Sequence, residues 1–287
     1  MAAGRDLMAK RGKTAARLFR FDRSFGRRFV AGVDEAGRGS LAGPLLAAGV
    51  LIDLERIARS DRLALARLDD SKQKTVEERE ELYPRVVRAA VCVSVAVRSV
   101  RAIDSFGLHV SNLSALTDCM RALAADDAAR LVDGFRLPAC GLEHTPVIDG
   151  DSRSAAIAAA SVVAKVTRDR YMRRVAALYP DWNFEGNVGY STPEHREAIL
   201  RHGICPLHRR SFASVAYSQL GLTDAEYPAS PPITAAGGRR DRSRPQAAAP
   251  DGLALPSLEG SADVIDIREA IGAEADPDDV EAVAGDA

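Results

Sequence analysis

The stretch Phe29-Val-Ala-Gly-Val-Asp-Glu-Ala-Gly-Arg-Gly39 decides the fold and the chemistry expected of this chain. Its first half is an apolar run typical of a buried strand, and two acids, Asp34 and Glu35, follow at the end of that run. Burying like charges side by side is costly unless something compensates, so strand ends normally avoid paired carboxylates. The usual compensation is a metal ion or a role in proton transfer. The stretch therefore predicts the edge of an active site, beside a glycine-rich turn that carries one cation, Arg38.

Composition places the chain among globular proteins with a sizeable core. Of its 287 residues, 46% are hydrophobic and 28% are charged, which is typical of a soluble domain. No apolar run reaches the roughly 20 residues that span a bilayer, and residues 1–28 are too rich in Arg and Lys for a signal peptide. The four cysteines are scattered without metal-ligand spacing, so we expect a reduced, cytoplasmic protein that does not contact membranes.

The net charge of −1 conceals two oppositely charged ends. Residues 1–28 carry nine Arg and Lys against two acids, and residues 251–287 carry one Arg against eleven acids. We expect a basic N-terminal arm over residues 1–27, a folded domain over 28–222, and a disordered Pro/Ala/Asp-rich tail over 223–287 with little to bury. The arm either adds non-specific affinity for a polyanion such as nucleic acid or is simply a solvated, disordered segment.

Apolar runs and helical periodicity alternate through the folded domain, which predicts an α/β fold. Because the first two strands are close in sequence, we expect them to form a hairpin and the sheet to be mixed rather than wholly parallel. The predicted strands are residues 29–33, 45–52, 91–97, 129–132 and 146–148. The predicted helices are residues 76–90, 109–124, 154–178 and 193–202.

Acids stand beside turn glycines at three places in the sequence. These acids are Asp34, Glu35, Asp133, Asp149 and Asp151. Each acid alone is also explained by a turn or a helix cap, so only their combination points to a site. Carboxylates at strand ends suit a divalent cation such as Mg²⁺ or Mn²⁺, whereas no Cys/His set has the spacing of a zinc site. The pattern leaves open whether Asp149 or Asp151 belongs to the site.

The glycine-rich turn after the first acids differs from the common nucleotide-binding loops. Residues 37–43 run Gly-Arg-Gly-Ser-Leu-Ala-Gly, one residue longer than the dinucleotide-binding fingerprint, and Pro44 interrupts the helix that should follow. No Gly-Lys-Ser/Thr follows, which excludes a P-loop. The turn instead predicts a backbone that approaches a ligand closely, with N–H groups available to phosphate or sugar oxygens.

Residues 32–44 closely resemble the signature of the type 2 ribonuclease H family, the bacterial ribonucleases HII. The resemblance extends over roughly residues 28–216, in the same order and with family-like spacing. It continues through Asp70-Ser-Lys72, Leu131-Val-Asp-Gly134, Gly150-Asp-Ser-Arg-Ser154, residues 157–169, Gly189-Tyr-Ser-Thr-Pro-Glu-His195 and His208-Arg-Arg-Ser-Phe212. It implies a ribonuclease H-like mixed sheet flanked by helices, with a small C-terminal helical part.

The resemblance also implies a metal site and distinguishes the two acids around Gly150. The fourth acid of the family corresponds to Asp151, so Asp149 is not expected to be a ligand. The implied catalytic and metal-binding quartet is Asp34, Glu35, Asp133 and Asp151. This quartet would hold two divalent ions, Mg²⁺ or Mn²⁺, about 3.5–4 Å apart, for an in-line attack by water on a phosphodiester.

Substrate-binding residues are implied as well. The glycine loop, which we define as Gly37, Arg38 and Gly39, would read the ribose 2′-hydroxyl and its phosphate at an RNA–DNA junction. Tyr190 would stack on the deoxyribose that follows the ribonucleotide. Polar positions that would face substrate phosphates are Lys72, Ser161 and Lys165.

Two positions depart from the family pattern. Ser40 stands where Pro is common, which predicts a less rigid loop, and Val188 stands where Lys commonly precedes Gly-Tyr, which removes one phosphate contact. His195 and His208 lie in matching motifs, but we interpret them as structural histidines.

The activity implied by the resemblance is hydrolysis of the RNA strand of RNA–DNA hybrids, and of duplex DNA 5′ to an embedded ribonucleotide. The products would carry 3′-hydroxyl and 5′-phosphate ends, and the protein would act as a monomer.

Three alternative functions make different demands on the sequence. A type 3 ribonuclease H would need a separate N-terminal domain, for which 27 residues are too few. Another metal-dependent nuclease of this fold class would lack the glycine loop, and a non-catalytic binding module would have lost some of the acids.

Overall fold

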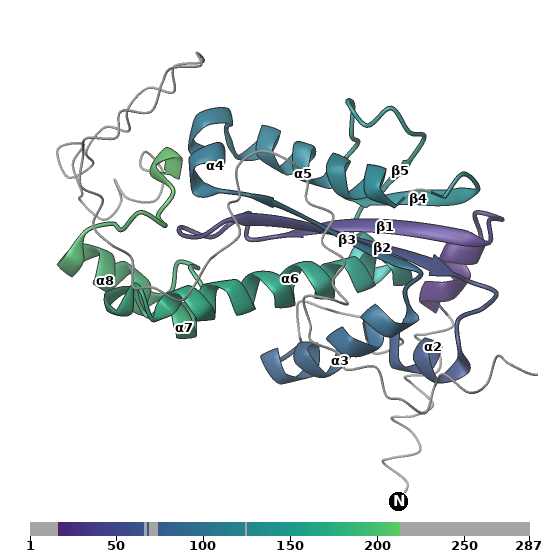
Figure 1. Ribbon diagram of the computed structural model, residues 1–287, viewed down its shortest axis with the longest axis horizontal. Coiled ribbons are helices and arrows are strands. Elements are labelled where there is room, and N and C mark those ends of the chain that lie inside the picture. The colour runs from purple at the N-terminus through teal and green to yellow at the C-terminus, as the bar shows by residue number, and fades with distance from the viewer. Residues whose placement is uncertain (1–16, 66–67, 69–73, 124, 213–287) are drawn as a thin grey trace, which may run out of the picture.

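The computed structural model describes residues 17–65, 68, 74–123 and 125–212 (Figure 1). The predicted tail, the first 16 residues of the predicted arm, and Lys72 lie outside the described residues. Across the described ranges, no helix is both long and apolar enough to cross a membrane.

The centre of the fold is a five-stranded sheet with the order β3-β2-β1-β4-β5. β1 (Phe29–Ala36) pairs antiparallel with β2 (Leu45–Asp53), which pairs antiparallel with β3 (Cys92–Arg98). β4 (Ala128–Asp133) pairs parallel with β1 and with β5 (Thr145–Val147). All five strands lie within a few residues of the predicted positions, and the predicted mixed α/β sheet is confirmed.

Helices cover both faces of this sheet (Figure 1). α4 (Val100–Phe106) and α5 (Leu108–Ala122) lie on one face, whereas α2 (Arg59–Leu65), α3 (Val76–Ala89) and α6 (Ala155–Ala176) lie on the other. Because α5 and α6 cover β2 from opposite faces, all nine residues of β2 are buried, and its sequence is a nearly continuous apolar run.

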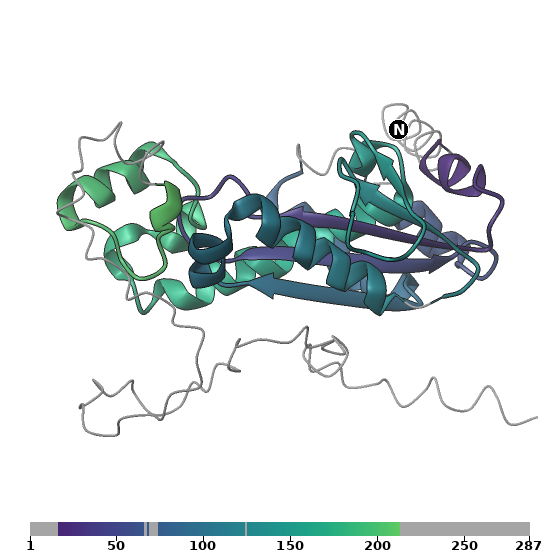
Figure 2. The same ribbon diagram turned by 90° about the horizontal axis from the view of Figure 1, so that it is seen from above.

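A small C-terminal helical part lies beyond one end of the sheet (Figure 2). It contains α7 (Phe184–Asn187), α8 (Pro193–His202) and the short 3-10 turns η4 (Pro180–Trp182) and η5 (Arg210–Phe212). These short elements are held by an apolar cluster of their own, which includes Phe184 and Cys205 together with Met172 and Val175 from the end of α6. α6 therefore connects the sheet to the C-terminal part.

The folded part begins before residue 28, where the sequence pattern places its start. Residues 17–23 are helical, and Leu18 and Phe19 are fully buried in the main core. Asp22 accepts hydrogen bonds from the first two backbone N–H groups of α6 at 3.0 and 3.2 Å, and so caps that helix. Burial raises the pKa of Asp22 to about 6. The high density of Arg around this segment conceals it in the sequence.

β1 and α6 approach each other with almost no space between their backbones. A Cβ atom at Gly32 would lie 2.3 Å from the carbonyl carbon of Ala156 and 2.4 Å from the nitrogen of Ile157. Residues 155–160 of α6, which run Ala-Ala-Ile-Ala-Ala-Ala, are fully buried at this contact. Glycine facing small residues thus sets the depth at which α6 lies on the sheet.

Gly32→Ala should destabilise the protein by at least about 2 kcal/mol, because a methyl group aimed at backbone atoms cannot be accommodated by a side-chain movement. The free energy of unfolding is measured by urea denaturation. Gly39→Ala is the matched control, since a Cβ at Gly39 meets no atom within 4 Å. Equal unfolding midpoints for the two variants would contradict the close approach.

Candidate active site

A cleft of about 450 Å³ opens at the end of β1. Its lining combines acids, the glycine loop and cationic side chains from segments that are far apart in sequence. The lining residues are Asp34, Glu35, Ala36, Gly37, Arg38, Gly39, Arg79, Asp133, Asp151, Ser161, Lys165 and Tyr190. Every predicted site residue that the structure describes is among them.

The pairing of the strands brings the acids together. Asp34 and Glu35 lie near the end of β1, and Asp133 is the last residue of the parallel neighbour β4. Because Val33 pairs with Val132, Asp34 and Asp133 follow at the same edge of the sheet. Asp151 lies in the 3-10 turn η3 (Gly150–Ser152), whose first backbone N–H donates to Oδ1 of Asp133 at 2.7 Å.

Asp149 and Asp151, which the pattern alone leaves equivalent, take different positions. Asp151 is buried, with 5% of its surface exposed, and lines the cleft. Asp149 is exposed and has a left-handed backbone with φ of 52°, and its carbonyl accepts hydrogen bonds from the backbone and hydroxyl of Ser152. Asp149 thus has the geometry of a turn residue outside the cleft.

Asp34 carries an electrostatic cost in the absence of a bound cation. Burial raises its pKa well above the ordinary value, and the charges of Asp133 and Glu35 raise it further. A hydrogen bond from Ser161 and one from the backbone N–H of Glu35, at 2.7 Å, oppose the shift. Ser161 therefore contacts an acid of the cleft from α6, in addition to lining the cleft itself.

Glu35 is in a similar position. Its pKa rises to about 7, mainly through burial and then through the charge of Asp133, while Arg38 opposes the shift from 3.9 Å. Asn112, fully buried on α5, also opposes it without reaching the geometry of a formed hydrogen bond. The buried Oε2 atom of Glu35 has no hydrogen-bond partner.

These acids fit a divalent cation with oxygen ligands. The cleft offers carboxylates, it leaves one buried carboxylate oxygen unsatisfied, and it raises the pKa of two acids, which a nearby cation would reverse. Over the described residues, no three His, Cys, Asp or Glu side chains are arranged so that they could hold a metal ion without moving. The acids line the cleft rather than enclose a finished coordination shell.

The glycine loop lies directly on other parts of the protein. Gly37 has φ of 86°, a conformation that favours glycine, and the guanidinium of Arg38 lies 4.6 Å from the ring centre of Phe135. Ser40 is fully buried, and its hydroxyl donates to the carbonyl of Gly37 at 2.8 Å. The sequence predicts a less rigid loop at this position, but the hydrogen bond of Ser40 restrains the loop backbone.

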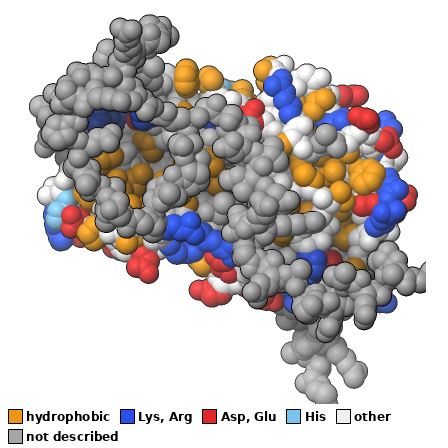
Figure 3. All heavy atoms as spheres, in the orientation of Figure 1, with side chains coloured by type: hydrophobic (Ala, Val, Ile, Leu, Met, Phe, Trp, Pro, Cys, Tyr) orange, Lys and Arg blue, Asp and Glu red, His pale blue; other side chains and the backbone are white. Residues whose placement is uncertain are grey.

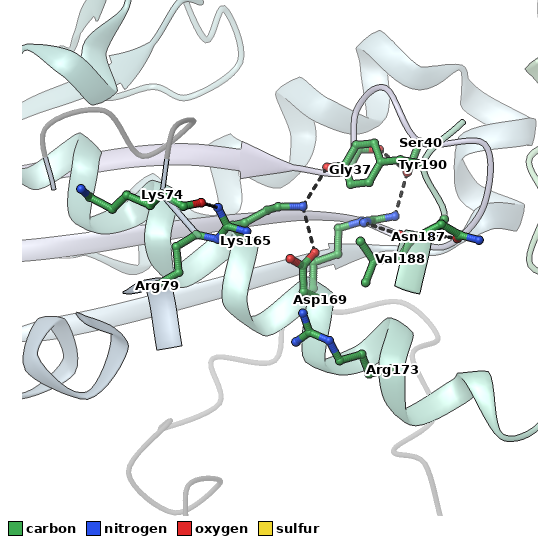
Figure 4. Close-up of polar contacts among 12 residues, drawn as sticks. Gly37, Ser40, Lys74, Arg79, Lys165, Asp169, Arg173, Asn187, Val188 and Tyr190 are labelled. Carbon is green, nitrogen blue, oxygen red and sulfur yellow. Dashed lines mark hydrogen bonds and ion pairs between the residues drawn. The ribbon is translucent and has the colours of Figure 1, made fainter. Parts of the chain in front are cut away.

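Tyr190 and Lys165 form one unit in the lining of the cleft (Figure 4). The ammonium group of Lys165 lies 3.0 Å from the carboxylate of Asp169, 3.4 Å from the Tyr190 hydroxyl and 4.4 Å from the Tyr190 ring centre. Lys165 is therefore partly occupied in orienting the tyrosine. Lys72, the other predicted lysine, is outside the described residues.

His195 and His208 form a hydrogen-bonded chain that ends at the backbone of Tyr190. The N–H of Cys205 donates to Nδ1 of His208, so neutral His208 carries its proton on Nε2 and donates it to Nε2 of His195 at 3.1 Å. His195 then donates from Nδ1 to the Tyr190 carbonyl at 2.8 Å. Burial lowers the pKa of both, that of His208 to about 3. This series of hydrogen bonds agrees with the interpretation of both residues as structural histidines.

Two residues of the site are not found by sequence patterns. Asn112 approaches Glu35 from α5, and Arg79 of α3 lines the cleft while donating to the backbone carbonyl of Lys74. Neither residue has a neighbouring motif, and both reach the cleft only because their helices pack on the sheet. On the rest of the described surface visible in Figure 3, side chains of both charge signs are interspersed rather than gathered in one patch.

Comparison with known proteins gives consistent relatives. The ribonuclease HII family matches residues 31–215. Ribonuclease HII of Geobacillus kaustophilus is 43% identical over 201 residues, which cover 69% of this chain and 74% of that protein. Ribonuclease HII of Rhodococcus erythropolis is 45% identical over 193 residues, which cover 67% and 83%. The crystal structure of ribonuclease H2 from Pyrococcus horikoshii matches with a TM-score of 0.56 at 26% identity, over 68% of this chain and 100% of that chain.

Without metal ions, Glu35 and Asp34 should contribute less to the stability of the wild-type protein as the pH rises. The folded-state pKa of Glu35 is about 7, above its ordinary 4.5, so the folded protein binds more protons than the unfolded chain between these values. The contribution of Glu35 to the free energy of unfolding therefore falls as the pH rises through that window, and Asp34 acts in the same direction. The lowered pKa of His208 acts in the opposite direction below its ordinary 6.5, and this contribution cancels when variants that keep His208 are compared. Asp34→Asn removes one repelling charge, so at about pH 8 the variant should be more stable than wild type by on the order of 1 kcal/mol.

The measurement is urea denaturation in EDTA at about pH 5 and about pH 8. Asp149→Asn is the control, because it makes the same chemical change at an exposed residue outside the cleft, and Asn tolerates the left-handed backbone. An Asp34→Asn variant less stable than wild type at the higher pH would refute the repulsion.

Proposed function

The chain belongs to the ribonuclease HII family, metal-dependent nucleases that cleave the RNA of RNA–DNA hybrids, and we propose that it also cuts duplex DNA on the 5′ side of an embedded ribonucleotide. The cut strand would carry 3′-hydroxyl and 5′-phosphate ends. The observation that carries this proposal is a single cleft lined by four acids, the glycine loop and Tyr190. It combines groups suited to phosphodiester hydrolysis with groups suited to reading a sugar.

The four acids would hold two divalent ions, Mg²⁺ or Mn²⁺. They are Asp34, Glu35, Asp133 and Asp151. Such ions lower the pKa of bound water and stabilise the leaving 3′ oxygen. No side chain needs to act as a covalent nucleophile. The role of the protein would be to hold the carboxylates at fixed positions in a cleft, where their mutual repulsion favours the binding of a cation.

Ribose would be distinguished from deoxyribose by the backbone of the glycine loop. A Cβ at Gly39 would meet no atom within 4 Å, so glycine leaves this part of the loop open at the cleft and a sugar can approach its polar groups closely. A site built to hydrogen-bond the 2′-hydroxyl loses heavily on deoxyribose, because its polar groups are then left unpaired. The loop would therefore select the cleavage position.

Tyr190 would recognise the deoxyribose after the ribonucleotide. Its ring is oriented by cations, with Lys165 4.4 Å and the Arg168 guanidinium 5.2 Å from the ring centre. Its backbone carbonyl is held by His195. A tyrosine fixed in this way offers a rigid apolar face to the sugar at little cost in entropy. Action as a monomer and location in the cytoplasm stay predictions from the sequence.

Asp34→Asn should abolish cleavage of a DNA duplex with one embedded ribonucleotide while leaving duplex binding largely intact. Loss of a group that merely orients a metal ligand typically costs 10–100-fold, so loss of a ligand should cost more than about 100-fold. Cleavage is measured with Mg²⁺ or Mn²⁺, and binding by fluorescence anisotropy. Asp149→Asn should cut at the wild-type rate.

The results separate two failures. Normal turnover by Asp34→Asn would remove the metal-ligand assignment. No cut by the wild-type protein, or cuts in an all-DNA duplex, would overturn the proposed activity itself.

Tyr190→Ala should reduce cleavage at a single ribonucleotide by about tenfold or more, since stacking on an aromatic side chain contributes ~1–3 kcal/mol. A continuous RNA–DNA hybrid should be affected less, because it presents no deoxyribose after the cut site. Tyr190→Phe keeps the ring and loses only the hydroxyl near Lys165, so it should retain most activity. An equal loss on both substrates would contradict the stacking role.

A further inference from the structure

Arg168 is a fully buried cation at the back of the glycine loop. It projects from α6 and donates from Nε to the carbonyl of Pro44 at 3.0 Å and from Nη2 to that of Ala42 at 2.9 Å. Its Nη1 donates to the carbonyl of Val188 at 3.0 Å. One guanidinium therefore joins the segment after the loop to the segment that leads into Tyr190.

Among the described residues, four oxygens accept hydrogen bonds from this guanidinium. Three are backbone carbonyls, and the fourth is the side-chain hydroxyl of Ser40. Nη2 of Arg168 donates to Oγ of Ser40 at 2.8 Å, and Ser40 passes the contact on by donating to the carbonyl of Gly37, also at 2.8 Å. Proline at this position would have no hydroxyl to do either. Figure 4 shows Gly37, Ser40, Val188 and Tyr190 gathered at the same place.

The loop is fitted directly onto Arg168. A Cβ atom at Gly37 would lie 2.1 Å from Nε of Arg168, and one at Gly43 would lie 3.2 Å from Nη2 and 2.3 Å from the sulfur of Met172. Both glycines have positive φ. Their identity thus follows from the presence of the guanidinium behind them as well as from the turn geometry.

Tyr190 also lies against the same cation. Its ring centre is 5.2 Å from the guanidinium carbon, and the preceding residue, Gly189, accepts backbone hydrogen bonds from Leu41 at 2.9 Å and Ala42 at 3.2 Å. The glycine loop and Tyr190 therefore both lie against the guanidinium of Arg168.

We propose that Arg168 and Ser40 form a positioning pair that sets the distance between the glycine loop and Tyr190, and so determines recognition of the ribose–deoxyribose junction. Neither residue lines the cleft, so the pair acts through the residues it holds and not by contact with substrate. This inference rests on the proposed cleavage at embedded ribonucleotides. It assigns the selectivity of that reaction partly to two residues behind the cleft.

The decisive variant is Ser40→Ala, which removes one acceptor and one donor and leaves Arg168 in place. We expect kcat/KM at a single embedded ribonucleotide to fall about tenfold, as for loss of a hydrogen bond to a charged group. On a continuous RNA–DNA hybrid we expect less than about a threefold change, because only the junction engages the loop and Tyr190 together. The Mn²⁺ concentration for half-maximal activity should stay unchanged, since the acids are not moved.

Ser94→Ala is the matched control. Ser94 is equally buried in β3 and donates to a backbone carbonyl, that of Cys119, at 3.0 Å, but it does not line the cleft. The control should lose comparable stability and keep the wild-type ratio of the two activities. If Ser40→Ala lowers both activities equally, lowers neither, or shifts the Mn²⁺ requirement, the positioning role is refuted.

A double-mutant cycle tests whether the pair acts as one unit. Arg168→Lys keeps the charge but cannot reach four oxygens from one nitrogen, so it should show the same loss of junction selectivity. Adding Ser40→Ala to it should cost less than about twofold more, because the shared contact is already broken. Additive losses would refute the coupling, and if Arg168→Lys does not fold, Ser40→Ala against Ser94→Ala decides alone. Wild-type cleavage at the single ribonucleotide is the internal check on the proposed function.

Discussion

Parallel pairing of β1 with β4 is the constraint on which the site depends. It aligns Val33 with Val132 and so leaves Asp34 and Asp133 together at one edge of the sheet, where their charges raise the pKa of Asp34. An antiparallel β4 would send Asp133 to the opposite edge. The parallel arrangement requires a long crossover connection from β1 to β4, and β2, β3 and α5 occupy that connection. This architecture therefore brings the acids of two adjacent strands to one edge of the sheet.

The close spacing of these acids requires a rigid structure around them. Gly32 lets α6 lie directly on β1, which carries Ser161 to Asp34 and Lys165 to Tyr190. Asp22, from the N-terminal helix, caps the start of α6 and so holds its position along β1. A helix fixed at its start and at its contact with the sheet can keep acids in a geometry that is unfavourable without a cation.

Sequence patterns predict the site where its signals are local. Paired acids after an apolar run, and acids next to glycine, are visible within a few residues, so Asp34, Glu35 and Asp133 can be assigned to one site from the sequence. The family resemblance adds Asp151 in preference to Asp149. Asn112 and Arg79 have no such signal, because they reach the cleft through the packing of α5 and α3.

Local sequence patterns also fail to show that Arg168 is buried and that the fold starts before residue 28. Arg168 looks like any surface arginine of a helix until residues 40–44 and 188–190 close around it. The helix over residues 17–23 is hidden by the charged residues that surround its two buried side chains, Leu18 and Phe19. Ser40 lies 128 positions from Arg168, and Ala155 lies 133 positions from Asp22, beyond any local window.

The buried arginines explain how cations and acids coexist without cancelling. Arg168 and Arg209 donate to backbone carbonyls and to Ser40, and Asp169, the neighbour of Arg168, pairs with Lys165 instead. If either guanidinium formed a close ion pair with Asp34 or Glu35, it would lower the carboxylate pKa and occupy the oxygens that a metal ion needs. Donation to neutral oxygens holds both guanidiniums behind the loop without placing them against the carboxylates of Asp34 and Glu35. The fold thus keeps the buried arginines that hold the loop apart from the carboxylates that line the cleft.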